Sequence, residues 1–248
     1  AGTASTAYTG VIQGTGGLNY NNSGNMELGG ANTFSGNFTV NNGRINLSGS
    51  VLNSDTVNIN DGGSLLANNS GGNALADTAV VNVASDGRFE NDEVETIKSL
   101  NVVSGGNVAL GNDLTLDDSA STIAGDISGS GNLNIIGEST VALSGTNAST
   151  GTTTISGDGA SNQSMLTLSG TSTAGALVVN GFGNVDLTGS AGDVTVNNNG
   201  SLLTTAGATD TATITGDFVL NAGGSLNVDI SNNAGALTND VYNVAGNA

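Results

Sequence analysis

The chain has 248 residues and a formal net charge of −18, with only Arg44, Arg88 and Lys98 basic. Nucleic acids and anionic membranes are bound through clustered Lys and Arg, so the composition argues against both as partners. There is no Cys, which excludes disulfides and thiolate metal sites, and no His, which removes the commonest general base and metal ligand.

Apolar residues make up 36% of the chain, and they recur as short alternating triplets between turns rich in Gly, Asn and Ser. This pattern predicts strands instead of disorder. The chain has no Pro, which is excluded from paired strands because it lacks an amide donor. No run of 18 apolar residues occurs, so we expect no membrane insertion by this segment.

The first clear unit lies between Gly30 and Gly49. It reads as a strand around Phe38 and Val40, an Asn-Gly turn, and a second strand around Ile45 and Leu47. We expect Asn42-Gly43 to allow the sharp bend, since these residue types tolerate positive φ.

Copies of this unit recur along the chain. Their strands start near residues 38, 57, 80, 100, 114, 133, 153, 177, 194 and 218, with gaps of 14 to 24 residues that average about 20. A unit of this size cannot bury its apolar face alone and must stack on its neighbours. The sequence therefore predicts an all-β fold, a single-domain parallel β-helix (β-solenoid) over residues 1–248, with about 12 coils of about 20 residues. An antiparallel sandwich is the rival architecture.

Two segments interrupt the pattern. Residues 91–98 concentrate charge and predict either a protruding loop or an acidic-edged strand that carries Ile97. Residues 158–163 predict a surface loop. At the ends, residues 1–10 predict a segment that caps the solenoid or pairs with another subunit, and residues 241–244 predict a strand.

The unit that begins at Gly30 resembles the passenger-associated transport repeat of bacterial autotransporters. The matching residues are Gly30, Asn32, Thr33, Phe34, Ser35 and Gly36, and a weaker copy at residues 145–155 lacks the aromatic residue. The resemblance implies a secreted right-handed parallel β-helix displayed at a bacterial surface, and it implies no enzymatic activity. No strands of a membrane barrel follow, so we expect either a cut passenger or a complete secreted protein.

Catalytic chemistry has little support in the sequence, and we predict no catalytic, cofactor-binding or metal site. Ser128, in Gly125–Gly129, has no base to activate it and is interpreted as part of a turn. The only tight acidic cluster, Asp113, Asp117 and Asp118, is interpreted as a solvated turn. Calcium alone stays open as a cofactor, because carboxylates and turn carbonyls are suitable ligands.

These features predict a non-enzymatic extracellular structural protein whose partner is itself. The leading hypothesis is a subunit that assembles head to tail into a bacterial surface fibre or matrix, because end-to-end contacts of this kind do not close on themselves. The alternative is a monomeric autotransporter-like passenger segment that acts as an adhesin or stalk. It would bind a host or neighbouring-cell surface through loops such as Asn91–Glu95.

Overall fold

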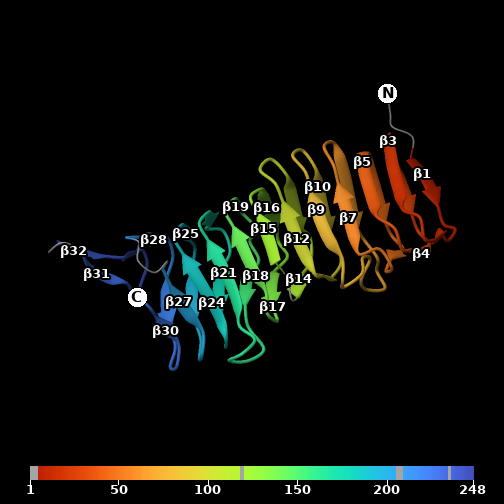
Figure 1. Cartoon of the computed structure of the whole chain (residues 1–248). Coiled ribbons are helices and arrows are strands. Elements are labelled where there is room, and N and C mark those ends of the chain that lie inside the picture. The colour runs from red at the N-terminus through yellow and green to blue at the C-terminus, as the bar shows by residue number, and fades with distance from the viewer. Residues whose placement is uncertain (1–4, 118–119, 205–208, 234–235) are drawn as a thin grey trace.

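The chain winds into a parallel β-solenoid of about 11 turns. The computed structural model describes residues 5–117, 120–204, 209–233 and 236–248. Figure 1 shows the coils stacked along one axis, with the two ends of the chain at opposite ends of the stack. The predicted fold class is confirmed, since every strand pair in the described residues except one hairpin is parallel, and the antiparallel sandwich is wrong.

Each coil passes through three strand positions, which we name face 1, face 2 and face 3 in chain order. Face 1 consists of β1 (Ser5–Tyr8), the second halves of β3 (Leu18–Leu28) and β5 (Phe38–Leu47), β8 (Gly63–Ala67), β10 (Arg88–Asn91), β13 (Asn107–Leu110), β16 (Asp126–Gly129), β19 (Thr146–Asn147), β22 (Thr171–Ser172), β25 (Ser190–Ala191), β28 (Thr211–Ile214) and β33 (Val241–Val244).

Face 2 follows face 1 in every coil. It consists of β2 (Gln13–Gly14), β4 (Ala31–Phe34), β6 (Ser50–Val51), β11 (Glu95–Ile97), β14 (Leu114–Asp117), β17 (Leu133–Ile136), β20 (Thr153–Ile155), β23 (Leu177–Val179), β26 (Val194–Val196) and β29 (Phe218–Leu220).

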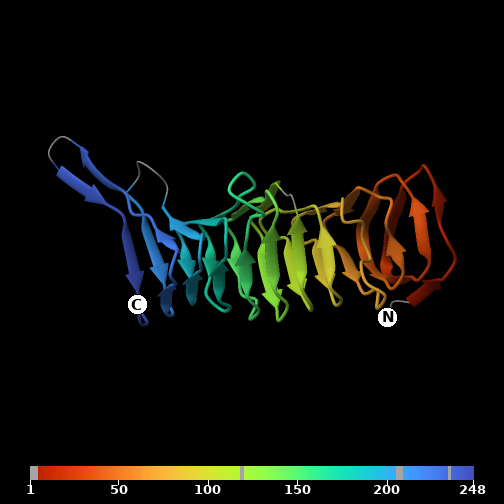
Figure 2. The same cartoon turned by 90° about the horizontal axis from the view of Figure 1, so that it is seen from below.

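Face 3 completes the coil. It consists of the first halves of β3 and β5, β7 (Thr56–Ile59), β9 (Val80–Val83), β12 (Ser99–Val102), β15 (Ala120–Ile123), β18 (Thr140–Leu143), β21 (Ser164–Leu168), β24 (Gly183–Leu187), β27 (Ser201–Leu203) and β30 (Ser225–Leu226). An antiparallel hairpin, β31 (Ile230–Asn233) and β32 (Ala236–Asn239), lies between the last strand of face 3 and β33. Figures 1 and 2 both show it projecting beyond the last coil.

The core is built from rows of inward side chains, one residue per coil. Alternation along each strand sends every second residue inward, and parallel pairing then stacks these residues on one another. On face 1 one such row crosses all twelve strands: Thr6, Met26, Ile45, Leu65, Phe89, Val108, Ile127, Asn147, Ser172, Ala191, Ile214 and Val244. Its apolar members from Ile45 to Ile127 are almost fully buried.

The turn that marks the repeat changes position along the solenoid. In the first coils the longer, Gly-containing turn, which we call the wide turn, joins face 3 to face 1. Gly62 and Gly105 lie in such turns, and both have positive φ. In the later coils it joins face 2 to face 3, as at Gly137 and Gly223, which also have positive φ. The 14-residue gap in the sequence repeat, between Leu100 on face 3 and Leu114 on face 2, is where the pattern moves from one face to another.

Polar ladders connect the outer surfaces of neighbouring coils, one along the strands of face 3 and one at a corner. Asn82 donates through its side-chain amide to Asn58 Oδ1 at 3.0 Å, and Asn101 donates in the same way to Asn82 Oδ1 at 3.1 Å. Asn221 and Asn197 extend a second ladder at a distance of 2.7 Å. The many Asn residues therefore add coil-to-coil hydrogen bonds to those of the backbone, without Cys.

Candidate functional site

Of the three acidic residues singled out in the sequence, the structure describes Asp113 and Asp117. Asp113 Oδ1 accepts hydrogen bonds from the backbone and side-chain nitrogens of Asn132 in the next coil, at 3.3 and 2.8 Å. Asp117 is the last residue of β14, and Asp118 lies outside the described residues. Asp113 lies half-buried at the corner before β14, where its carboxylate forms a contact between coils, whereas Asp117 lies in a strand and not in the predicted turn.

Ser128 lies within β16 and not in a turn, so that prediction is wrong. Its hydroxyl donates to the Val108 carbonyl of the preceding coil at 3.3 Å. The sequence pattern suggests a turn for Gly125–Gly129 because the corner before β16 is short. It has only two residues, Ala124 and Gly125. Within the described residues, no group of three or more Asp or Glu side chains is arranged to hold a metal ion.

The charged segment 91–98 is the acidic-edged strand of the two predicted alternatives. Its ends are buried: Asn91 belongs to β10, and β11 carries Glu95 and Ile97 into the core. Asp92 and Val94 are the exposed residues between them. The predicted loop at residues 158–163 is confirmed as an exposed turn closed by a bridge between Gly159 and Asn162.

Glu95 is a buried carboxyl group that sequence reasoning missed. Its two oxygens accept the backbone amides of Ala74 and Leu75, at 2.9 and 3.2 Å. In this coil face 2 has no regular strand, so the carboxyl group takes hydrogen bonds that a strand carbonyl would otherwise accept. Burial raises the pKa of Glu95 to about 7, the two amides oppose the rise, and Asp77 adds to it.

A second buried carboxylate ties the last coils together. Asp240 accepts hydrogen bonds from the hydroxyl of Thr204 and from the backbone amides of Asp210 and Asp229, the amides at 3.0 and 2.8 Å. The Thr204 hydroxyl, more than the amides, holds the pKa of Asp240 below its usual value. Asp240 therefore fixes the points where the chain leaves and re-enters the solenoid around β28 and the hairpin.

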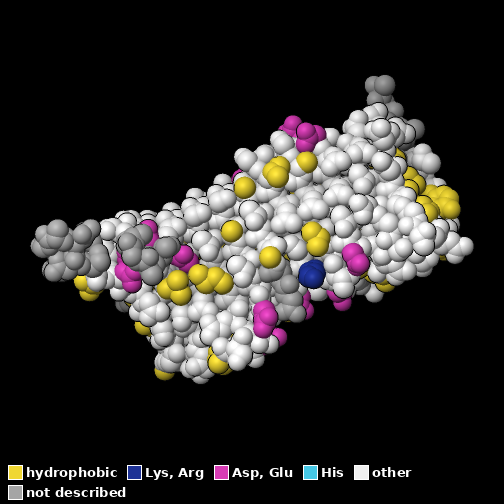
Figure 3. Space-filling model, viewed as in Figure 1, with side chains coloured by type: hydrophobic (Ala, Val, Ile, Leu, Met, Phe, Trp, Pro, Cys, Tyr) yellow, Lys and Arg dark blue, Asp and Glu magenta, His cyan; other side chains and the backbone are white. Residues whose placement is uncertain are grey.

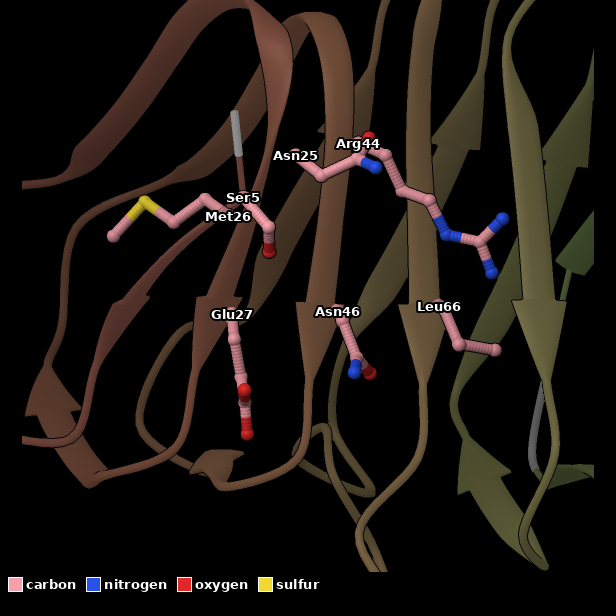
Figure 4. Close-up of a pocket in the computed structure, with 7 residues that line it drawn as sticks. All are labelled: Ser5, Asn25, Met26, Glu27, Arg44, Asn46 and Leu66. Carbon is pink, nitrogen blue, oxygen red and sulfur yellow. The ribbon is translucent and has the colours of Figure 1, made fainter. Parts of the chain in front are cut away.

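A polar pocket of about 210 Å³ lies on face 1 and is shown in Figure 4. Glu27 and Asn46 point in the same direction from neighbouring strands, while the Arg44 side chain reaches across Leu66. Arg44 pairs with Glu90 at 3.1 Å, and Arg88 pairs with the other oxygen of the same carboxylate at 2.5 Å. Two of the three basic residues of the chain thus lie on this face and share one acid.

The two end coils have a different surface from the rest of the rod. Of eleven large apolar residues that are exposed in the described part of the chain, eight lie in the first and last coils: Tyr8, Val11, Val219, Leu220, Leu226, Val228, Ile230 and Val241. Among the residues that the structure describes, β1 pairs only with β3 and β33 only with β28, so each of these strands has one open edge there. Elsewhere the side chains visible in Figure 3 are mostly uncharged, with scattered acidic groups.

These features define an all-β parallel β-solenoid whose apolar exposure is concentrated at its ends. No protein-family model matches the chain, and no curated protein is significantly similar to it. No helix among the described residues is long and apolar enough to cross a membrane.

Proposed function

We propose that the chain is a non-enzymatic extracellular structural protein, a β-solenoid subunit that assembles head to tail into a bacterial surface fibre or matrix. The observation that supports this proposal is the concentration of exposed apolar side chains on the two end coils, beside open strand edges. An open edge with apolar side chains favours pairing with another strand.

The geometry of the two ends supports polymerisation over closed assembly. Both ends carry strands of face 1 and face 3, and all of these strands run in the parallel arrangement of the stack. A contact between the last coil of one copy and the first coil of the next uses two different surfaces, so each copy keeps one surface free. Such a contact propagates into a filament.

The extracellular and bacterial location rests on the likeness of residues 30–36 to the autotransporter repeat. The negative charge of −18 keeps lateral surfaces of neighbouring rods apart. Because salt screens this repulsion, assembly of the purified chain should accelerate as ionic strength rises.

The second candidate function is that of an adhesin or stalk that acts as a monomer. The pocket on face 1 favours it, because Arg44, Glu27 and Asn46 there offer both donors and acceptors to a polar ligand. The loop first considered for this role is a weaker candidate, since Asn91 and Glu95 are buried.

Sedimentation of the purified chain tests the proposal. We expect the full chain to sediment as a polymer, and a chain without residues 1–9 to sediment as a monomer, because β1 is then removed. A matched control is Thr154→Lys, a charge placed on the outer side of face 2 far from both ends. Monomers for all three proteins would contradict the fibre and favour the adhesin.

A further inference from the structure

We propose that β33 of one copy pairs in parallel with β1 of a second copy, with Asn243 opposite Ser5 and Val244 opposite Thr6. This inference rests on the proposed head-to-tail assembly and specifies its register. The occupant of the open edge is a second copy of this chain, whose inward side chains extend the rows of the first.

The inward row on face 1 is unbroken from Thr6 at one end to Val244 at the other, with one residue from each strand. If the next copy stacks so that the corners of its first coil lie above the corners of the last coil, the row continues into the next copy. The residue above Val244 is then Thr6 of the next copy. This fixes the register on face 1 without any adjustable choice.

Face 3 is consistent with the same alignment. Its inward row runs from Leu18 at the first coil to Leu226 at the last; the residues are paired in each step, except that Leu100 meets Ser121 through a hydrogen bond from its amide to the Ser121 hydroxyl. Corner alignment therefore also places Leu18 of the next copy on the line of Leu226. Both of these side chains are partly exposed in the single chain, and they mark the two ends of the face 3 row.

Alternative registers are less favourable for physical reasons. A slip by one residue turns the inward side chains of β1 outward. A slip by two residues keeps the alternation but places Tyr8 above Val244 and shifts every corner by about 6.6 Å, the length of two strand residues. In the proposed register the large Tyr8 ring instead lies above Gly246, which has no side chain.

The joint differs from an ordinary coil contact on face 3. Strand β30 precedes β33 in the last coil, so one strand position remains open there between β30 and Leu18 of the next copy. The hairpin leaves the solenoid at this corner and extends beyond the last coil (Figures 1 and 2). The joint therefore has fewer backbone hydrogen bonds than the contacts within a copy, and filaments should break at joints first.

Disulfide cross-linking tests the register, because the chain has no Cys of its own. One preparation carries Asn243→Cys and a second carries Ser5→Cys, so a bond between them can only join two copies. Both positions face outward and are exposed. Residues that lie opposite each other across a strand pair are within the Cα separation that a disulfide requires, whereas a two-residue offset exceeds about 7 Å.

We expect mild oxidation of the mixed preparations to give a covalent dimer. The matched control mixes Asn243→Cys with Ala7→Cys, which is also exposed and lies two residues away, and we expect at least about tenfold less dimer from it. A higher yield from Ala7→Cys would overturn the register. The lack of any cross-link in preparations that sediment as polymers would also overturn the register. In either of these two cases the head-to-tail proposal itself would stand. Monomeric sedimentation of the unsubstituted chain would overturn both proposals together.

Discussion

Replacing Glu95 by Gln removes one hydrogen-bond acceptor from the interrupted part of face 2. The amide oxygen of Gln can accept from Ala74 or Leu75, but its NH₂ group cannot accept from the other. A buried amide without a partner costs about 1–3 kcal/mol. We therefore expect E95Q to be destabilised by the lower end of this range at about pH 5, where the native carboxyl group is mostly neutral and its hydroxyl oxygen is a weak acceptor that the NH₂ group lacks.

The effect should depend on pH, and its sign follows from the raised pKa. Burial raises the pKa of Glu95 from 4.5 to about 7. The raised pKa therefore stabilises the folded state by up to about 3 kcal/mol, and this contribution is fully present below pH 4.5. It is lost as the pH rises through 7. Gln does not titrate, so the stability difference between the native protein and E95Q should shrink or reverse by about pH 9.

Urea unfolding at a series of pH values measures this difference. Asp92→Asn is the matched control, because it removes a nearby charge from an exposed side chain. It should leave the pH profile close to that of the native protein. A difference between E95Q and the native protein that stays constant from acid to alkaline pH would refute the assignment of Glu95 as the titrating group.

Three further substitutions test the coil contacts. Gly129→Ala should lower the thermal midpoint strongly, because φ is +110° and the new methyl group would lie 2.1 Å from the Leu110 carbonyl oxygen. Gly16→Ala is the control and should have little effect, because its new methyl group has nothing within 4 Å. Equal thermal midpoints for the two variants would contradict this packing. Asn82→Leu should lower the free energy of unfolding in urea by about 1–2 kcal/mol, because it breaks the hydrogen bonds to Asn58 and Asn101. An unchanged free energy of unfolding would show that the ladder does not stabilise the fold. Asp240→Asn should increase the rate of proteolysis near the hairpin, because it weakens the hydrogen bonds to Asp210 and Asp229. In the native protein, cleavage there should also increase as the pH falls through the lowered pKa of Asp240. Unchanged cleavage in the variant and at low pH would contradict this role of Asp240.

The fold was accessible from the sequence because one physical constraint repeats in every coil. Alternation at residues such as Phe38 and Val40 predicts strands, and the Asn-Gly turn at Gly43, whose φ is +73°, predicts a sharp corner. Stacking follows because the units are too small to fold alone. The resulting count of about 12 coils is close to the observed number of about 11.

Sequence reasoning followed the wide turns and could not see the third strand of each coil. Where the corner is short, as before Ser128, a single Gly marks it, and the strand that follows is interpreted as part of the turn. The inward direction of Glu95 was also hidden, because a charged residue in a strand ordinarily faces water. Its burial depends on the irregular coil at Ala74, which lies 21 residues earlier in the chain.

The end coils were only partly accessible. Residues 241–244 were predicted as a strand, and β33 confirms it. The hairpin before it was not anticipated. The row from Thr6 to Val244 could not be traced in the sequence, because the spacing between its members varies from coil to coil. That row is what turns a general expectation of stacking into a specific register.

Negative-stain electron microscopy of the purified protein shows whether copies of this chain continue one another's coils. A single copy of about 11 coils spaced by about 4.8 Å is roughly 50 Å long. We expect unbranched rods of one solenoid's width that are many times this length, and we expect them to disappear when residues 1–9 are removed. Isolated particles of one subunit's length at every protein and salt concentration would contradict this expectation.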